Sequence, residues 1–306
     1  MSAVSAILRV AIMPGQPTFR VRAAEAAFAV TLAVGLAAGC APAPVPHRQE
    51  SPPPEAQLVS FRAADGAQLH GFIYLPPGPG PHPAVLFNHG SEKWPGWQPA
   101  LAAFYRANGF AFFIPHRRGQ GRSSDAGPYI VDRQPSKLQI VANGAASGRT
   151  IIALHEEAAR DVEAALAWLR ARPDVDPRRI FMSGVSFGGI QTLLAAERDL
   201  GVRAYAAFAP GAMSWRWVTG LDARLQQAAQ HAHAPVLIVQ AENDYNLAPS
   251  QVLGPILERA GKGRAVLFPA FGTSEKDGHA GFACRPEGTA IWGPAVLTFF
   301  RGATPP

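Results

Sequence analysis

Residues 180–189 read Ile-Phe-Met-Ser-Gly-Val-Ser-Phe-Gly-Gly, and this stretch decides the fold. Its first residues form a short apolar run typical of a buried strand, and residues 188–197 are expected to form a helix. Between them, Ser186 lies in a G-x-S-x-G pattern, whose small residues permit a strained tight turn. A helix that starts there directs its first N–H groups toward developing negative charge. The stretch therefore predicts a nucleophile elbow, with a structural glycine-rich turn as the alternative.

Strand and helix patterns alternate on both sides of this stretch. After a predicted hairpin formed by residues 58–61 and 68–74, apolar runs typical of strands lie at 84–87, 110–114, 204–209, 236–239 and 265–268. Helical patterns lie between them at 98–108, around 162–169, and at 221–231, 252–260 and 288–300. This alternation predicts an α/β fold with a mostly parallel central sheet and helices on both faces. Residues 125–150 have no clear period and are interpreted as an insertion.

A serine nucleophile needs a base, and the base needs a carboxylate that orients it. In elbow architectures these residues follow later strands, in the order acid and then histidine. The predicted strand 236–239 leads to Asp244, with Glu242 as the main rival, and the predicted strand 265–268 leads to a polar loop that contains His279. Asp277 lies too close to His279 in the sequence to be the expected orienting group.

Backbone N–H groups are needed to stabilise the negative oxygen of a tetrahedral intermediate. Phe187, directly after the serine, is expected to supply one of them. The loop after the predicted strand 84–87 reads Asn88-His89-Gly90-Ser91, and the Ser91 N–H is expected to supply the second. His89 is interpreted as structural.

The N-terminal region has the pattern of an export signal. Residues 26–39 are an apolar run too short to span a bilayer, and arginines precede it. Residues 36–40, Leu-Ala-Ala-Gly-Cys, resemble the lipobox of bacterial lipoproteins, which implies a signal peptide at 1–39 and lipidation of Cys40. Ordinary secretory cleavage nearby is the alternative, and Met13 is a plausible start. The proline-rich residues 41–56 are expected to form an extended tether, so that an exported domain is held near a membrane.

The composition indicates a globular domain and disfavours nucleic-acid binding, a disulfide scaffold and a cysteine-based zinc site. Hydrophobic residues make up 48% of the 306 residues and charged residues 16%, which indicates a globular chain that can fill one α/β domain, expected at 57–302. The net charge is +6, but only four residues are lysines and the arginines are scattered, so nucleic acid is not an expected partner. Two cysteines are too few for a disulfide scaffold or a cysteine-based zinc site.

These motifs together resemble the α/β-hydrolase superfamily, and within it the dienelactone-hydrolase-like and prolyl-oligopeptidase-like branch. The resemblance covers residues 57–302 and rests on residues 88–90, on the R-x-G-x-G-x-S stretch at 117–123, on 184–189, on Asp244 and on His279. It implies an α/β-hydrolase fold and a cofactor-free, metal-free serine hydrolase that cleaves small carboxylic esters through an acyl-enzyme. Dienelactone hydrolases proper use a cysteine, so Ser186 favours ordinary esters. A peptidase or acyltransferase with the same residues, or a non-catalytic binding lipoprotein, are the alternatives.

Four further features of the sequence have an ordinary structural explanation beside a functional one. The stretch 117–123 lacks the lysine and helix context of a phosphate loop. His231 and His233 have no carboxylate or thiol at ligand spacing, so no metal is expected there. Cys284 is expected to be a buried free thiol. Four tryptophans in predicted loops could line a pocket or simply pack: 94, 97, 215 and 217.

Overall fold

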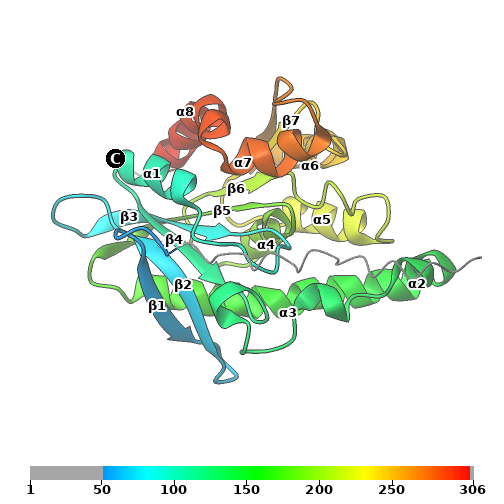
Figure 1. Cartoon of the computed structure of the whole chain (residues 1–306). Helices are drawn as coiled ribbons and strands as arrows, with labels where there is room; N and C mark the ends of the chain where they lie inside the picture. The colour runs from blue at the N-terminus through cyan, green and yellow to red at the C-terminus, as the bar shows by residue number, and fades with distance from the viewer. Residues whose placement is uncertain (1–50, 304–306) are drawn as a thin grey trace, which may run out of the picture. The chain divides into compact units, whose positions relative to one another are not determined.

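In the computed structural model, which describes residues 51–303, eight strands form one sheet in the order β1-β2-β4-β3-β5-β6-β7-β8 (Figure 1). β1 and β2 pair antiparallel with each other, and β2 pairs antiparallel with β4. From β4 to β8 all neighbours are parallel. The predicted α/β class with a mostly parallel sheet is confirmed. The strands are β1 (Gln57–Arg62), β2 (Gln68–Tyr74), β3 (His82–Asn88), β4 (Ala111–His116), β5 (Val175–Val185), β6 (Tyr205–Phe208), β7 (Val236–Ala241) and β8 (Gly263–Phe268).

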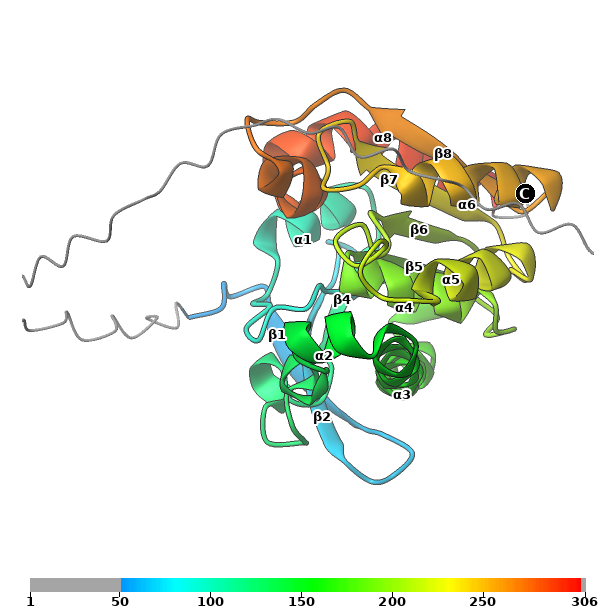
Figure 2. The ribbon, with the colours of Figure 1, turned by 90° about the vertical axis from the view of Figure 1, so that its right-hand side faces the viewer.

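Helices cover both faces of this sheet, as expected. In Figure 1, α1 and α8 lie above the sheet and the long α3 lies below it; Figure 2 shows α3 nearly end-on, with α4 and α5 on the same side. α6 packs against α5, β7 and β8. The helices are α1 (Pro99–Ala107), α2 (Lys137–Ala142), α3 (Gly144–Arg170), α4 (Phe187–Ala196), α5 (Leu221–Gln230), α6 (Ala248–Arg259), α7 (Phe282–Cys284) and α8 (Pro286–Gly302), with short 3-10 helices η1 (Gly121–Ser123) and η2 (Ile130–Arg133) and one π-helical turn, η3 (Asp277–Gly281).

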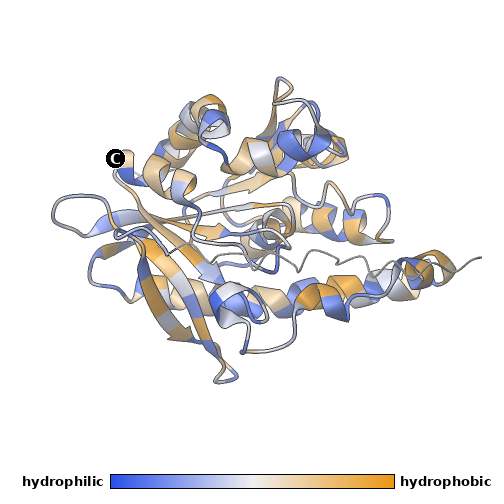
Figure 3. Ribbon diagram, viewed as in Figure 1, coloured by the Kyte–Doolittle hydropathy of each residue, from blue (hydrophilic) through white to orange (hydrophobic). Residues whose placement is uncertain are grey.

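The central strands are apolar on both faces because each face is covered by helices. On β3, Leu86 belongs to the cluster formed with α3, α4 and α5, whereas its neighbours Val85 and Phe87 belong to the cluster formed with α1 and α8. Side chains alternate between faces along a strand, so both sets must be apolar. Figure 3 shows the apolar colouring along these strands. The carboxyl ends of the parallel strands consequently meet at one edge, where the predicted site residues follow them.

Residues 125–150 are more ordered than their lack of period suggested. They contain η2, α2 and the first turns of α3, which starts at Gly144, inside the expected insertion, and includes the predicted periodic positions at 162–169. A capping box starts α2: the Ser136 hydroxyl accepts from the Gln139 N–H, and the Gln139 side chain accepts from the Ser136 N–H. At Gly148 of α3, a Cβ atom would lie 2.1 Å from the carbonyl oxygen of Thr219. The start of α3 therefore needs small residues for close packing, and these leave no apolar period to detect.

The predicted signal peptide at 1–39, the lipidation site Cys40 and most of the tether lie outside the described residues. The last six residues of the expected tether, 51–56, contain one turn, in which the Ala56 N–H donates to the Pro53 carbonyl at 2.8 Å, and no helix or strand. Among residues 51–303, none of the helices combines the length and the apolar character that crossing a bilayer requires.

Candidate active site

Ser186 occupies the turn between β5 and α4 with φ 58° and ψ −115°, a backbone conformation that non-glycine residues rarely adopt. Its N–H donates to the carbonyl of Phe208 at 3.0 Å, and its own carbonyl accepts from the Ile190 N–H at 3.1 Å. A Cβ atom on Gly188 would lie 1.8 Å from the carbonyl oxygen of Asn88, so only glycine fits there. The turn is thus strained and held from both sides, as a nucleophile elbow requires.

Asp244 and His279 are in direct contact. Asp244 follows β7, and His279 lies in the π-helical turn η3 after β8 rather than in an irregular loop. The Nδ1 atom of His279 lies 2.8 Å from Oδ1 of Asp244, and both residues are buried. An ionised carboxylate only accepts hydrogen bonds, so the proton of the imidazole is on Nδ1. Nε2 of His279 is then an unprotonated acceptor, buried and without a hydrogen-bond partner among the described residues.

The surroundings of Asp244 hold its carboxylate in one orientation. Oδ1 also accepts from the Tyr245 N–H at 2.7 Å, and Oδ2 accepts from Nε2 of Gln240 at 2.9 Å. The Gln240 side chain is itself fixed, because its Oε1 accepts from the N–H and the hydroxyl of Ser250. The sequence did not predict this role of Gln240, whose one sequence signal is a polar residue near the end of an apolar strand.

Neither Glu242 nor Asp277 forms a hydrogen bond or ion pair with His279 in the described part of the chain. Glu242 is exposed. Asp277 accepts from the Ser274 hydroxyl at 2.7 Å and pairs with Arg285 at 2.7 Å. These contacts lower the pKa of Asp277, with the Ser274 hydrogen bond as the largest cause. Asp244 is therefore the carboxylate that orients His279.

The structure joins Asp244 to His279, but it shows no hydrogen bond from Ser186 to His279 within residues 51–303. Ser186 follows β5, and Asp244 follows β7, two strands away in the same parallel sheet. Such hydrogen bonds are often long before substrate binds.

The two predicted oxyanion donors come from adjoining backbone. Phe187 is the first residue of α4, so its N–H has no partner within the helix. The loop with Ser91 follows β3, and the Ser91 N–H donates to no partner among the described residues. The close approach of Gly188 to the carbonyls of Asn88 and His89 brings the start of α4 directly against this loop. His89 is buried, and burial, followed by the nearby Arg117, holds its pKa well below the ordinary value.

The other features single out no further site. Cys284 is a free thiol, as expected, but the residue is half-buried rather than buried. Burial around its sulfur raises the pKa of the thiol to about 12. His231 and His233 are exposed, and residues 51–303 contain no group of three potential metal ligands. Among the four tryptophans, 97 and 215 pack against the core, whereas 94 and 217 are largely exposed.

Comparisons with known proteins agree with this fold. Residues 46–230 match the family model for acetyl xylan esterase, and no curated protein matches the chain. An esterase of Pyrococcus furiosus is 14% identical, with 81% of this chain and 91% of that chain covered and a TM-score of 0.56. A Klebsiella pneumoniae protein assigned as a dienelactone hydrolase is 17% identical, covered over 80% and 98%, with a TM-score of 0.54.

Larger peptidases share the fold as well. The acylaminoacyl peptidase of Pyrococcus horikoshii is 18% identical, with 80% of this chain covered and a TM-score of 0.56. This chain spans only 41% of that peptidase. At such low identities the likeness shows the fold alone, and it confirms the expected α/β-hydrolase fold.

Proposed function

Since the chain belongs to the acetyl xylan esterase family, we propose that it is an esterase that cleaves carboxylic esters with Ser186 as nucleophile. The observation that carries this proposal is the buried Asp244–His279 pair, in which Nε2 of His279 has no partner among the described residues. This pair follows β7 and β8, and the strained turn with Ser186 follows β5, so all three residues come after parallel strands at the same edge of the sheet. A histidine held by a carboxylate, with its second nitrogen free, is the arrangement that a general base needs.

The proposed reaction has two halves. The hydroxyl oxygen of Ser186 attacks the ester carbonyl while Nε2 of His279 takes the hydroxyl proton, and Asp244 stabilises the imidazolium. The negative oxygen of the tetrahedral intermediate accepts hydrogen bonds from the N–H groups of Phe187 and Ser91. His279 gives its proton to the leaving alcohol, and an acyl-enzyme remains. Water, deprotonated by His279, then releases the carboxylic acid and restores the serine.

Acetyl esters of hydroxylated compounds are the first substrates to test, because the matching family is described by acetyl xylan hydrolysis. The peptidases among the structural neighbours are larger proteins, and the present chain corresponds to less than half of their length. Peptide substrates are therefore a comparison in the assay, and ester cleavage is the proposed activity.

The test compares the wild type with Ser186→Ala. We expect the wild type to hydrolyse p-nitrophenyl acetate and acetylated xylan faster than a peptide p-nitroanilide, and to be labelled by a fluorophosphonate. Ser186→Ala should lose both activity and labelling. Equal labelling of the two proteins excludes Ser186 as the nucleophile, and a wild type without labelling or hydrolysis excludes the proposed function.

For the N-terminal region, we propose export and anchoring at a membrane through a lipid on Cys40. The lipobox-like residues 36–40 and the proline-rich stretch after them support this proposal. Metabolic labelling with a radioactive fatty acid should mark the wild-type protein and not the Cys40→Ala variant. Label retained by Cys40→Ala excludes this anchor.

A further inference from the structure

The Arg117 side chain is hydrogen-bonded to the backbone of the loop that carries Ser91. It follows β4 and is only 3% exposed. Its Nη2 atom donates to the carbonyl of His89 at 2.9 Å and to the carbonyl of Gly90 at 2.5 Å. The carbonyl of Gly90 and the N–H of Ser91 belong to one peptide plane, so holding the first fixes the direction of the second. A cationic donor on that carbonyl also polarises the peptide and strengthens the Ser91 N–H as a donor.

The same guanidinium packs on the side chain of Phe187, the residue that is expected to supply the other oxyanion donor. Its central carbon lies 4.8 Å from the centre of the Phe187 ring. On this ring, the His155 imidazole also packs, with 4.2 Å between ring centres. Burial lowers the pKa of His155 to about 3, so the imidazole is neutral and the cation beside Phe187 is Arg117. One buried cation therefore donates to the backbone of the loop with Ser91 and packs on the side chain of Phe187, the two residues whose N–H groups are expected to bind the oxyanion.

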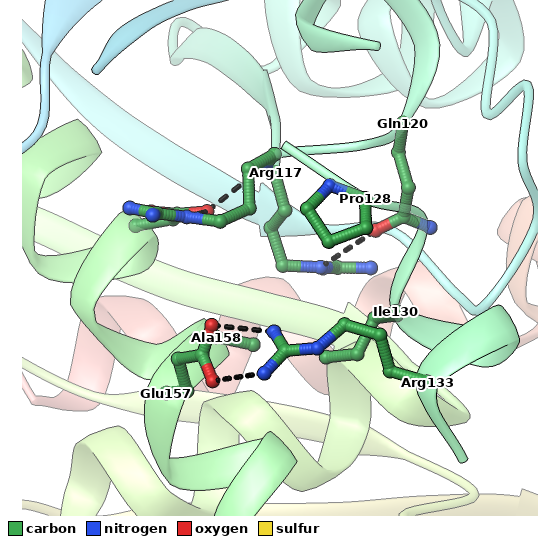
Figure 4. Close-up of a pocket in the computed structure, with 9 residues that line it drawn as sticks. Arg117, Gln120, Pro128, Ile130, Arg133, Glu157 and Ala158 are labelled. Carbon is green, nitrogen blue, oxygen red and sulfur yellow. Dashed lines mark hydrogen bonds and ion pairs between the residues drawn. The ribbon is translucent and has the colours of Figure 1, made fainter. Parts of the chain in front are cut away.

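This arginine has no carboxylate as a hydrogen-bond or ion-pair partner among residues 51–303. Its Nε donates to the side-chain oxygen of Gln120, and its Nη1 is buried without a partner. Arg117 and Arg133 line the same pocket but differ in their partners (Figure 4). Arg133 donates two hydrogen bonds to the Glu157 carboxylate, whereas Arg117 donates one to the neutral Gln120 side chain. Burial lowers the pKa of this guanidinium to about 10, while the nearby carboxylates of Glu92 and Asp161 favour its charged form without a hydrogen bond to it. A buried charge without a hydrogen-bonded carboxylate is costly, and a fold that retains one is expected to use its field.

A residue from the segment 125–150 holds the carbonyl group of Ser91, on the other side of this residue from its N–H. The hydroxyl of Tyr129 donates to the carbonyl of Ser91. Arg117 thus holds the peptide before the Ser91 N–H, and Tyr129 holds the peptide after Ser91. With both neighbouring carbonyls engaged, the loop has little freedom to rotate its N–H away from the site.

We propose that Arg117 is a positioning residue that preorganises the oxyanion hole and adds the field of an unpaired cation behind it, with Tyr129 fixing the outer side of the loop. This inference rests on the proposed function. The stabilisation acts on charge that exists only in the transition state, so it should change kcat and leave KM nearly unchanged.

The experiment measures kcat, KM and the inhibition constant of a boronic acid, whose adduct with the serine mimics the tetrahedral intermediate. Loss of an oxyanion contact typically lowers kcat ~100-fold or more, and we expect Arg117→Met to lose activity on this scale, with the boronic acid weakened in parallel. Arg117→Lys should recover part of the loss, because it keeps the charge. Tyr129→Phe should lower kcat about 2- to 10-fold, the value of one hydrogen bond. Arg133→Gln is the matched control and should keep the wild-type kcat.

An Arg117→Met variant that folds, as circular dichroism shows, and keeps kcat within about 3-fold overturns the inference, as does a loss shared by Arg133→Gln. A change confined to KM also overturns it. If Arg117→Met does not fold, an unchanged kcat in Tyr129→Phe decides against the proposal that Arg117 and Tyr129 hold the loop with Ser91. A wild type that cleaves no ester refutes the proposed function instead.

Discussion

Replacing Asp244 by asparagine tests how the carboxylate controls His279. In the wild type its two oxygens accept from three donors: Nδ1 of His279, the Tyr245 N–H and Nε2 of Gln240. An asparagine has only one oxygen, and Gln240 cannot turn round because Ser250 holds its Oε1. One group must therefore face the NH2 of the new side chain.

Either orientation of the introduced asparagine lowers activity. With the oxygen toward Gln240, the NH2 faces His279, so the imidazole carries its proton on Nε2 and cannot act as a base. With the oxygen toward His279, the proton stays on Nδ1, but the charge that stabilises the imidazolium is lost. In a Ser-His-Asp protease of another fold the wrong tautomer alone costs ~10⁴ in kcat, which corresponds to about 5 kcal/mol of transition-state stabilisation. A buried donor without an acceptor also costs about 1–3 kcal/mol of stability.

The assay is steady-state hydrolysis of p-nitrophenyl acetate by the wild type, Asp244→Asn and Glu242→Gln, with urea unfolding of each. We expect kcat to fall ~10³- to 10⁴-fold in Asp244→Asn. Glu242→Gln should stay close to the wild type, because Glu242 is exposed. An Asp244→Asn variant with more than a tenth of the wild-type kcat, or an equal loss in Glu242→Gln, would refute the assignment.

Three further predictions concern the scaffold. Gly188→Ala should fail to give soluble folded protein, because the new Cβ would lie 1.8 Å from a backbone oxygen. In the control Gly302→Ala the new Cβ meets no atom within 4 Å, so this variant should melt at the wild-type temperature. Equal melting temperatures of the two variants contradict this prediction. Burial lowers the pKa of His116 to about 4 and that of His155 to about 3. Between pH ~6.5 and these values, the two histidines bind a proton in the unfolded chain but not in the folded one. Each of them should therefore lower the free energy of unfolding by about 1.4 kcal/mol for every pH unit of acidification. Urea midpoints that stay constant between pH 7 and pH 4.5 would disprove this prediction. Burial raises the pKa of the Cys284 thiol to about 12, so iodoacetamide at pH 8 should modify the peptide containing Cys284 much faster after unfolding; equal rates would show an accessible thiolate.

The fold class and the serine turn could be predicted because their signals are local. A buried strand, a turn with glycines and a helix follow one another within 175–196, and each needs only its neighbouring residues to be recognised. The alternation of apolar runs and helical periods extends this pattern along the chain. The start of α3 escaped detection, because close packing there requires small residues such as Gly148 rather than an apolar stripe.

The choice of carboxylate was only partly predictable. Glu242 and Asp244 lie two residues apart after the same strand, and the order of the motifs fits both. The turn after β7 buries one and exposes the other, and the Gln240 side chain completes the orientation. Such a decision depends on the path of a few backbone bonds, which no local pattern records.

By itself, the sequence determined the α/β architecture, the position of Ser186 between a strand and a helix, and the order of candidate partners after it. Only the tertiary structure decided which groups surround them. The Arg117 guanidinium reaches a loop 27 residues earlier in the chain, and the Tyr129 hydroxyl reaches Ser91 across 38 residues. Periodicity and turn chemistry are properties of neighbouring residues, whereas an unpaired buried cation behind a backbone loop exists only once distant segments have packed together.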